Sequence, residues 1–321
     1  MNMDMDKTGQ TAKQTGFSLV ELMVAMTLGL ILLGGVVSVM SNTSASYGEL
    51  NKASRQLDNG RYAIQVLRED IRHAGYYGEF FDVPAPAALP DPCATTLPAL
   101  LAGMSLPIQG FAGGVAAPLG CLTGYVSNTD VLVVRRAATT VTPTAAMTSS
   151  EVYLQSRSDS RVLQPGPFDN AVFDLKKRDG SVADVRRYLV HIYYIRNCSD
   201  CTGGGDGIPT LTRLEFAGGD FSTALPLAEG IETLQLRYGV DTSGDAVAND
   251  MVALPASLAQ WSGLVSVEVG LLARNVEPST GYEDTKTYSL AGVNLGPFND
   301  RFKRHAYSTL ARAVNPGDRR I

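Results

Sequence analysis

The chain contains few of the residues that dominate metal-rich, disulfide-rich and nucleic-acid-binding proteins. It has 4 Cys and 3 His among 321 residues, too few for a dense disulfide or metal scaffold. Its 27 Lys and Arg are outnumbered by 32 Asp and Glu, and the net charge of -5 predicts no basic surface for nucleic acid. Hydrophobic residues still make up 45% of the chain, which excludes a disordered protein and a many-span membrane protein.

Sequence motifs of common enzymes are also missing. The chain has no G-x-S-x-G, no H-E-x-x-H and no phosphate-binding G-x-x-x-x-G-K-[ST]. Its histidines, His73, His191 and His305, are far apart in the sequence and are expected to be structural. We therefore expect a protein that is not an enzyme.

Charged residues are absent from one long N-terminal stretch, from Leu22 through Gly48. An apolar segment, residues 17–40, begins just before this stretch and would be about 36 Å long as a helix, at ~1.5 Å per residue. The hydrocarbon core of a bilayer is ~30 Å thick, so the segment can span it. A secretory signal peptide has a shorter apolar core followed by a small-residue cleavage site, and neither is present here.

Glu21 sets this segment apart from an ordinary membrane anchor. A carboxylate at the centre of an apolar helix costs about 2.5–3.5 kcal/mol on insertion, and less near a helix end. No Lys, Arg or His occurs in residues 17–48 to pair with it. Cleavage after Gly16 would create an amino group on Phe17, one helical turn from Glu21, and this amine could neutralise the carboxylate.

The sequence GFSLVE at positions 16–21, followed by an apolar helix, resembles the class III signal of type IV prepilins and pseudopilins. The resemblance implies that a prepilin peptidase cleaves after Gly16 and methylates the amine of Phe17. It also implies that Glu21 guides docking into a growing filament. The leader, residues 1–16, departs from the family pattern because its two Lys and two Asp make it neutral, where such leaders are usually basic.

A helical pattern resumes beyond the apolar stretch and is expected over residues 49–79. Apolar or small residues recur at alternating spacings of three and four, typical of one helix face packed on a sheet: Leu50, Ala53, Leu57, Gly60, Ile64, Leu67, Ile71 and Ala74. Charged residues between them are expected on a solvent-exposed face: Lys52, Arg55, Arg61, Arg68, Glu69, Asp70 and Arg72.

Further segments resemble the PilW branch of minor pilins. They are residues 59–63, 70–78, 234–241 and 265–274, together with Trp261. The resemblance implies a long N-terminal helix joined to a soluble head.

The head, residues 80–321, is expected to be rich in strands. Residues 80–122 hold seven prolines and no Lys or Arg, which predicts a loop-rich insertion. Strand-like segments follow at 131–135, 152–155, 187–196, 210–216, 232–238, 264–273, 287–290 and 302–311. No alternation of strands and helices occurs, so we expect an α+β fold with a mainly antiparallel sheet and a long N-terminal helix, membrane-spanning in its first half, packed on it.

The four cysteines are expected to form two disulfides in the periplasm. Cys93 and Cys121 flank most of the Pro-rich segment, and Cys198 and Cys201 are three residues apart beside a Gly-rich turn. Four cysteines allow three pairings, of which we favour Cys93–Cys121 with Cys198–Cys201.

Asp241, Ser243 and Asp245 have the spacing at which a calcium loop begins, and Asp250 follows. The loop template requires Gly and Glu where this chain has Ala246 and Val252. We favour a polar hairpin turn and keep a calcium loop as the alternative; no other cofactor is expected.

These observations predict a PilW-like minor pilin that forms part of the initiation and tip complex of a type IV pilus. Its expected location is the inner membrane, with a single span and a periplasmic head, and then the pilus tip. The resemblance implies as partners the prepilin peptidase, other minor pilins, the major pilin and a large tip adhesin, with roles in twitching motility, adhesion and DNA uptake. Two alternatives remain: a minor pseudopilin of type II secretion, and a membrane-anchored periplasmic protein that binds calcium or adheres.

Overall fold

The computed structural model describes residues 16–217, 219–221 and 224–318. The chain divides into two compact units, one ending at Asn51 and the other beginning at Lys52. The α-helices of the described residues are α1 (Leu19–His73), α2 (Leu97–Gly103), α3 (Leu258–Ser262) and α4 (Val314–Asp318). Two 3₁₀ helices are η1 (Thr144–Ala146) and η2 (Thr202–Gly204).

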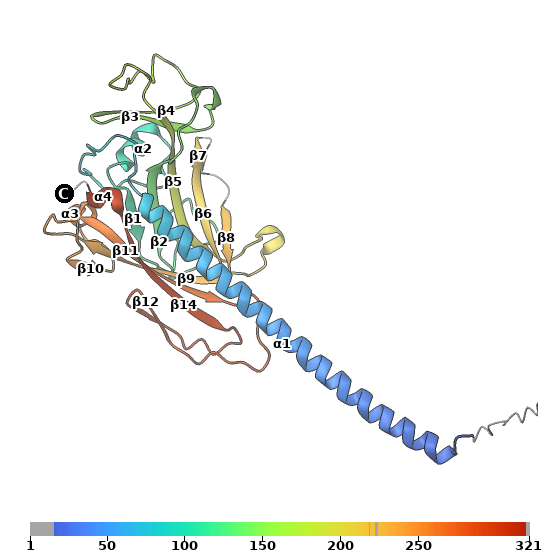
Figure 1. Cartoon of the computed structure of the whole chain (residues 1–321). Coiled ribbons are helices and arrows are strands. Elements are labelled where there is room, and N and C mark those ends of the chain that lie inside the picture. The colour runs from blue at the N-terminus through green and yellow to red at the C-terminus, as the bar shows by residue number, and fades with distance from the viewer. Residues whose placement is uncertain (1–15, 218, 222–223, 319–321) are drawn as a thin grey trace, which may run out of the picture. The chain divides into compact units, whose positions relative to one another are not determined.

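The second unit contains all the strands (Figure 1). They are β1 (Ile108–Phe111), β2 (Val131–Ala137), β3 (Val152–Arg157), β4 (Ser160–Pro165), β5 (Val185–Arg196), β6 (Thr210–Ala217), β7 (Asp220–Phe221), β8 (Leu225–Glu229), β9 (Ile231–Val240), β10 (Asp250–Val252), β11 (Leu264–Arg274), β12 (Tyr288–Leu290), β13 (Val293–Leu295) and β14 (Arg304–Arg312). Each of the eight predicted strand segments overlaps one of these strands, and the segments predicted at 287–290 and 302–311 begin one and two residues too early.

The strands form three sheets, and every strand pair among the described residues is antiparallel. The largest sheet follows the order β1-β2-β5-β3-β4, with β6 also beside β5 and with β7 and β8 beside β6. A second sheet has the order β10-β9-β11-β14, and β12 and β13 form a hairpin. The predicted α+β class with a mainly antiparallel head is therefore confirmed.

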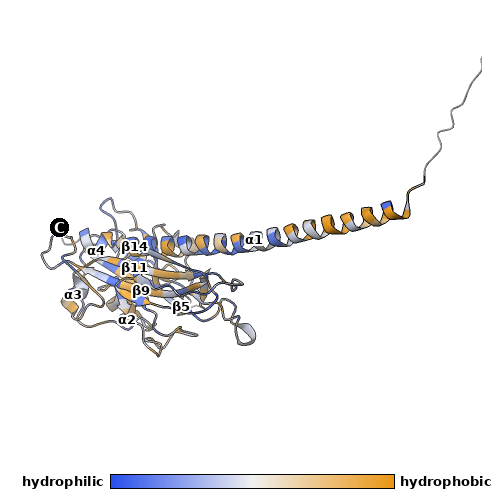
Figure 2. Ribbon diagram, turned by 90° about the horizontal axis from the view of Figure 1, so that it is seen from below, coloured by the Kyte–Doolittle hydropathy of each residue, from blue (hydrophilic) through white to orange (hydrophobic). Residues whose placement is uncertain are grey.

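Helix α1 changes character along its length, as the hydropathy colours in Figure 2 show. Its segment up to Asn51 exposes apolar side chains almost throughout. From Lys52 onward one face is buried: Gly60 is inaccessible, and Ala63, Leu67 and Ile71 are fully covered, as is Ala74 beyond the helix end. The predicted packing of this helix on sheet residues is confirmed.

A glycine is required where α1 approaches β14 most closely. A Cβ atom at Gly60 would lie 2.2 Å from the ring of Tyr307. Such a separation is too short for two carbon atoms, so any larger residue would push the helix away from the strand. The glycine within the apolar stripe is thus explained by close packing.

Two positions on the helix differ from the predicted pattern. Leu50, placed on the packed stripe, has 64% of its surface exposed. Asp70, placed on the solvent-exposed face, has only 5% exposed. The prediction was wrong for Asp70 because a buried carboxylate is stable once it has partners, and those partners come from strands far away in the sequence.

Strand β5 lies between two hydrophobic clusters and has both faces covered. Tyr193 and Ile195 belong to a cluster that also includes the buried α1 residues and the four-stranded sheet. Tyr188, Val190 and Ile192 belong to a second cluster on the other face, which includes residues of the Pro-rich segment. Both faces of this strand are therefore buried.

The Pro-rich segment is more ordered than predicted. It contains helix α2 and strand β1, and β1 pairs with β2 along its whole length. Leu100 and Met104 are buried in the second cluster, and Ile108 is buried in the first. The prediction of a loop-rich insertion holds for most of the segment, and these few apolar residues bury enough surface to fix one short helix and one edge strand within it.

Candidate assembly site

The predicted processing site lies immediately before α1. Gly16 and Phe17 precede the helix, and 86% of the Phe17 surface is exposed. Residues 1–15 of the predicted leader lie outside the described residues. The bond after Gly16 is therefore placed in a non-helical, exposed segment, which is the arrangement that a protease needs.

Ser18 and Glu21 form a reciprocal cap at the start of the helix. The Ser18 hydroxyl oxygen accepts a hydrogen bond from the Val20 N–H at 3.3 Å. In return, the Ser18 N–H donates to Glu21 Oε2 at 3.4 Å. The Glu21 side chain thus reaches back toward Phe17. The sequence analysis missed this role of Ser18, although the S-x-x-E spacing of a capping box was visible.

Two hydroxyl groups after Glu21 form hydrogen bonds within the helix. The hydroxyl of Thr27 donates to Met23 O at 3.0 Å, and that of Thr43 donates to Val39 O at 2.8 Å. Such bonds to the preceding turn remove the cost of a hydroxyl in hydrocarbon. By length and composition, α1 is a helix that can cross a bilayer.

The following part of α1 is joined to the head by side-chain hydrogen bonds to backbone carbonyls. Gln56 is 8% exposed, and its Nε2 donates to Ala273 O at 2.7 Å and to Lys303 O at 2.9 Å. Lys52 Nζ donates to Pro278 O at 3.0 Å. These bonds attach the helix to the strand end and loop that follow β11.

A second junction surrounds Asp70 near the end of α1. Arg136 Nε donates to Asp70 Oδ1 at 2.6 Å, and the Tyr193 hydroxyl donates to Oδ2 at 2.9 Å. His191 Nδ1 lies 2.7 Å from the same Oδ2, and His191 Nε2 lies 3.6 Å from Glu215 Oε2. His191 is 3% exposed, so this chain of charges crosses the interior between α1, β2, β5 and β6.

The charges in this junction shift one another's pKa values. Burial would raise the pKa of Asp70, but His191 and Arg136 outweigh burial and hold it well below its usual range. Burial would lower the pKa of His191, but the two carboxylates beside it raise it. The hydrogen bond from His191 is the main reason that the pKa of Glu215 falls to about 2. The arrangement therefore favours a charged His191 held between two charged carboxylates.

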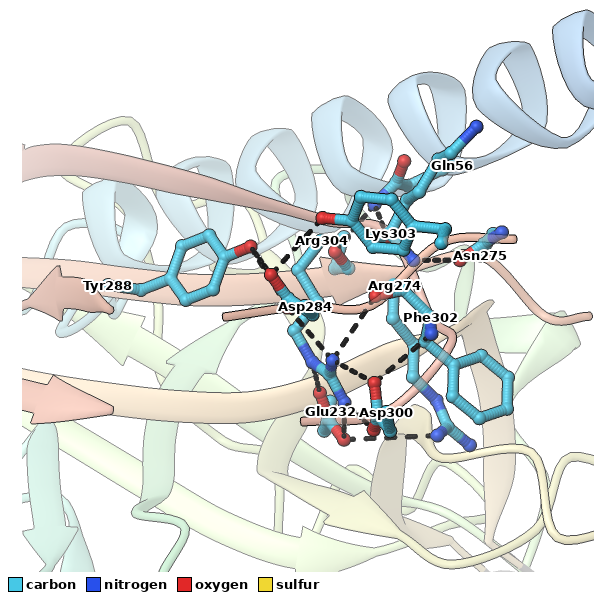
Figure 3. Close-up of polar contacts among 12 residues, drawn as sticks. Gln56, Glu232, Arg274, Asn275, Asp284, Tyr288, Asp300, Phe302, Lys303 and Arg304 are labelled. Atoms are coloured by element: carbon cyan, nitrogen blue, oxygen red, sulfur yellow. Dashed lines mark hydrogen bonds and ion pairs between the residues drawn. The ribbon is translucent and has the colours of Figure 1, made fainter. Parts of the chain in front are cut away.

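A third junction surrounds Arg304 at the start of β14 (Figure 3). Its guanidinium is fully buried and donates to both oxygens of Glu232, at 2.6 and 3.1 Å. It also donates to both oxygens of Asp300, at 2.7 and 2.6 Å, and to Asp284 Oδ2 at 3.0 Å. The Arg304 guanidinium thus binds three carboxylates, one from β9 and two from the segment between β11 and β14.

Aromatic and amide groups complete the Arg304 junction. The guanidinium carbon lies 3.8 Å from the ring centre of Phe298, and the Tyr288 hydroxyl donates to Asp284 Oδ1 at 2.9 Å. Asn275 Oδ1 accepts from the Lys303 N–H at 2.6 Å. Since Gln56 binds the carbonyl of the same Lys303, the loop and the helix are fixed together. The sequence analysis identified none of these residues.

Two protein-family models match parts of the chain. A family model described as Type IV Pilus-assembly protein W matches residues 192–315. A model described as Prokaryotic N-terminal methylation motif matches residues 11–37, which include Gly16, Phe17 and Glu21. The chain thus has the methylation motif of pilins and a PilW-like segment in its head.

Two other comparisons were made for this chain. Among solved structures, it is similar to a type IV-like pilin from Thermus thermophilus, with 12% identity, 82% of this chain and 97% of that chain covered, and a TM-score of 0.36. Among curated proteins, no match was found. The methylation motif implies processing by a prepilin peptidase and assembly with other pilins.

The PilW-like head contains two disulfides, Cys93–Cys121 and Cys198–Cys201. These are the two pairs that the sequence favours. The first closes the Pro-rich segment around α2 and β1, and the second closes a turn before the Gly-rich η2. Both stabilise irregular parts of the head that have little regular secondary structure of their own.

The segment at 241–250 of the PilW-like head is a turn between paired strands. Asp250 lies opposite Val240 in the β9–β10 ladder, as expected for the favoured hairpin. Burial would raise the pKa of Asp241, but the N–H groups of Gly244, Ala246 and Ser243 lower it to about 2.

Binding of calcium by this turn stays a prediction. Of the four residues proposed as ligands, Asp241 and Ser243 are hydrogen-bonded to each other, through the Ser243 N–H at 2.9 Å. Asp245 accepts from the Val247 N–H at 3.0 Å. Over the described residues, no group of three His, Cys, Asp or Glu is placed to hold a metal ion.

Proposed function

We propose that this chain is a minor pilin of a type IV pilus that acts in the complex that initiates the filament and then sits at its tip. A prepilin peptidase cuts after Gly16 and methylates Phe17. The apolar part of α1 holds the protein in the inner membrane, with the head in the periplasm, until assembly begins. The partners are other minor pilins, the major pilin and a large tip adhesin.

One observation carries the proposal: Glu21 is the single charged residue of positions 17–48, and its carboxylate accepts a hydrogen bond from the N–H of Ser18, the neighbour of the residue that cleavage would make the N-terminus. Once the amine of Phe17 is free, Glu21 can pair with it or with the amine of a neighbouring subunit. In a bundle of apolar helices an unpaired charge is costly, so pairing favours docking in one register. Through the assembled pilus the protein would support twitching motility, adhesion and DNA uptake.

The function of Glu21 can be tested with Glu21→Ala and a matched control, Ser38→Ala, which also removes one polar group from the apolar segment. Both variants should be cleaved and methylated, because the peptidase acts before docking. We expect Glu21→Ala to reduce the protein in sheared pili at least about tenfold, equivalent to ~1.4 kcal/mol of lost association. Ser38→Ala should match the wild type. Normal incorporation of the processed Glu21→Ala protein would contradict the proposal.

A further inference from the structure

Strand β14 forms one edge of the four-stranded sheet. It pairs with β11 from Arg304 to Arg312 without a register shift. On its other side, no strand of the described residues pairs with it. The strand therefore has one satisfied edge and one free edge.

The ladder shows which backbone groups point away from the sheet. The Asn275 N–H donates to Lys303 O at 3.0 Å, and the Ala313 N–H donates to Val265 O at 2.8 Å. In an antiparallel pair these bonds recur at every second residue, so the odd-numbered residues of β14 bond to β11. The N–H and C=O groups of the even-numbered residues point outward, and no bond from another described residue reaches them at Ala306, Ser308 and Leu310.

This edge lacks the features by which free edges usually avoid pairing. Proteins protect exposed edges with prolines, bulges or charged side chains. The segment from His305 to Ala311 has no Pro, Lys, Arg, Asp or Glu, and the ladder beside it has no bulge. Leu310 in this segment has 62% of its surface exposed. The edge is thus suited to accept another strand.

The groove on the helix side of β14 is basic. It has a volume of about 860 Å³ and lies between α1 and the end of the strand. Three arginines line it, Arg68, Arg72 and Arg312, against two carboxylates, Glu69 and Asp318. An acidic side chain placed here would meet excess positive charge.

The groove on the opposite face of β14 is apolar. It has a volume of about 420 Å³ and is lined by Leu310 together with residues of the β9–β10 turn and of β11, with Arg312 as its one charged residue. Leu310 and Arg312 lie at the boundary of the two grooves and line both of them. Val247 in that turn has 61% of its surface exposed. Since successive side chains of a strand point to opposite faces, a segment added along β14 would place alternate residues in the two grooves.

We propose that the free edge of β14 is the docking site for an extended segment of another protein of the pilus assembly, in which apolar and acidic residues alternate. The segment would add as a fifth strand beside β14, with its apolar residues near Val247 and its acidic residues near Arg68 and Arg72. This proposal rests on the proposed function, because it places the partner in the same assembly.

A second copy of the chain fits the edge poorly. Antiparallel pairing of two β14 strands centred on Ser308 would place Arg304 opposite Arg312 at each end. It would also bring the two basic grooves together on one face. Charge complementarity therefore favours an acidic segment from a different protein.

The edge can be tested in piliated cells with a photo-crosslinking amino acid at Val247 in the full chain. We expect an adduct with another pilus protein, joined through an extended segment in which acidic and apolar residues alternate. Ser308→Pro removes only an outward N–H, so it should lower adduct yield at least tenfold, whereas Ser308→Ala should leave it unchanged. The thermal midpoint of the purified full-length Ser308→Pro chain, compared with that of Ser308→Ala, checks that the head still folds.

A second pair of variants keeps the test decisive if the proline perturbs the fold. Leu310→Asp places a negative charge in the apolar groove and should lower the adduct yield tenfold. Leu225→Asp changes an equally apolar exposed residue on β8 and should not. An adduct between two copies, no adduct, or an adduct that none of these changes affects would overturn the proposal. If the same cells process Phe17 normally and carry pili, only the edge proposal fails and the proposed function stands.

Discussion

Asp70 of helix α1 and His191 of strand β5 meet in the interior of the head, with Oδ2 and Nδ1 separated by 2.7 Å. They are 121 residues apart in the sequence. The pair therefore joins the end of α1 to strand β5 of the largest sheet.

Removal of the Asp70 charge should weaken this junction strongly. Asp70→Asn leaves Arg136 without its counter-ion and His191 with Glu215 alone, and loss of one partner of a buried ion pair typically costs about 3–5 kcal/mol. Chemical unfolding of the full chain in detergent would measure the loss. Asp58→Asn, an exposed carboxylate on the same helix, is the matched control and should change the free energy of unfolding by less than about 0.5 kcal/mol. Equal effects of the two changes would contradict the role of Asp70.

The stability of the head should fall as the pH rises. The raised pKa of His191 means that the folded state binds its proton more tightly than the unfolded chain does. The resulting stabilisation is complete below about pH 6.5 and is lost as the pH rises through the folded-state pKa. Asp70 and Glu215 have lowered pKa values, so their contributions to stability have the opposite pH dependence. These contributions are present above the usual pKa range of carboxyl groups and are lost in acid, for Glu215 as the pH falls through about 2.

Thermal unfolding of the full chain from pH 5 to pH 9 would measure this dependence. His191→Gln should lower the midpoint at pH 5 and remove most of its decline above pH 6.5. His305→Gln, at an exposed position of β14, should keep the decline. A decline of wild-type size in His191→Gln would show that another group is responsible.

Arg304 should stabilise the segment between β11 and β14 by about as much as Asp70 stabilises the packing of the helix. Arg304→Met leaves Glu232, Asp284 and Asp300 close together with only Arg274, 3.9 Å from Glu232, as a cation, and we expect a loss of about 3–5 kcal/mol. Arg304→Lys keeps the charge but cannot bind two carboxylates through both of their oxygens, so its loss should be intermediate.

Arg301→Met serves as the control for this experiment because Arg301 is exposed in the same loop. Denaturant unfolding would rank the three variants, and the account requires the order Arg304→Met, Arg304→Lys, Arg301→Met from most to least destabilised. A wild-type midpoint for Arg304→Met would contradict the account.

The two disulfides should differ in what they contribute. Cys93 and Cys121 are separated by 28 residues, and closing such a loop is worth about 3.5 kcal/mol in the chain-entropy treatment. Cys198 and Cys201 are separated by 3, which gives about 1.5 kcal/mol. Paired Cys→Ser variants of each bridge, measured by thermal unfolding of the full chain, should show the larger loss for Cys93 and Cys121. The reverse order would show that native packing, not loop closure, sets the effect.

Much of the fold was predictable because its signals are local. The spacing of Leu67, Ile71 and Ala74 predicts a packed helix, and the alternating apolar residues of β5 and β11 predict strands. The Pro-rich segment was harder, since α2 and β1 are short and are stabilised by contacts with β2 and the second cluster. Short elements of this kind depend on tertiary packing more than on pattern.

The polar junctions could not be predicted, because their partners lie far apart in the chain. Glu232 and Arg304 are separated by 72 residues, and nothing near either residue indicates that they meet. Asp70 did have a visible signal: it lies three residues after Leu67 and four before Ala74, in phase with the buried face. Its charge suggested solvent exposure, and only the fold shows that Arg136 and His191 compensate for burial. The free edge of β14 is likewise a property of sheet order, which no local pattern gives.

The central claim is that cleavage creates the partner that Glu21 lacks, and the mass of the mature N-terminus tests it most directly. The protein should be purified from membranes of cells with an active prepilin peptidase and analysed by mass spectrometry. The account predicts a chain that begins at N-methylated Phe17. A chain that still carries its first 16 residues in those cells would contradict it.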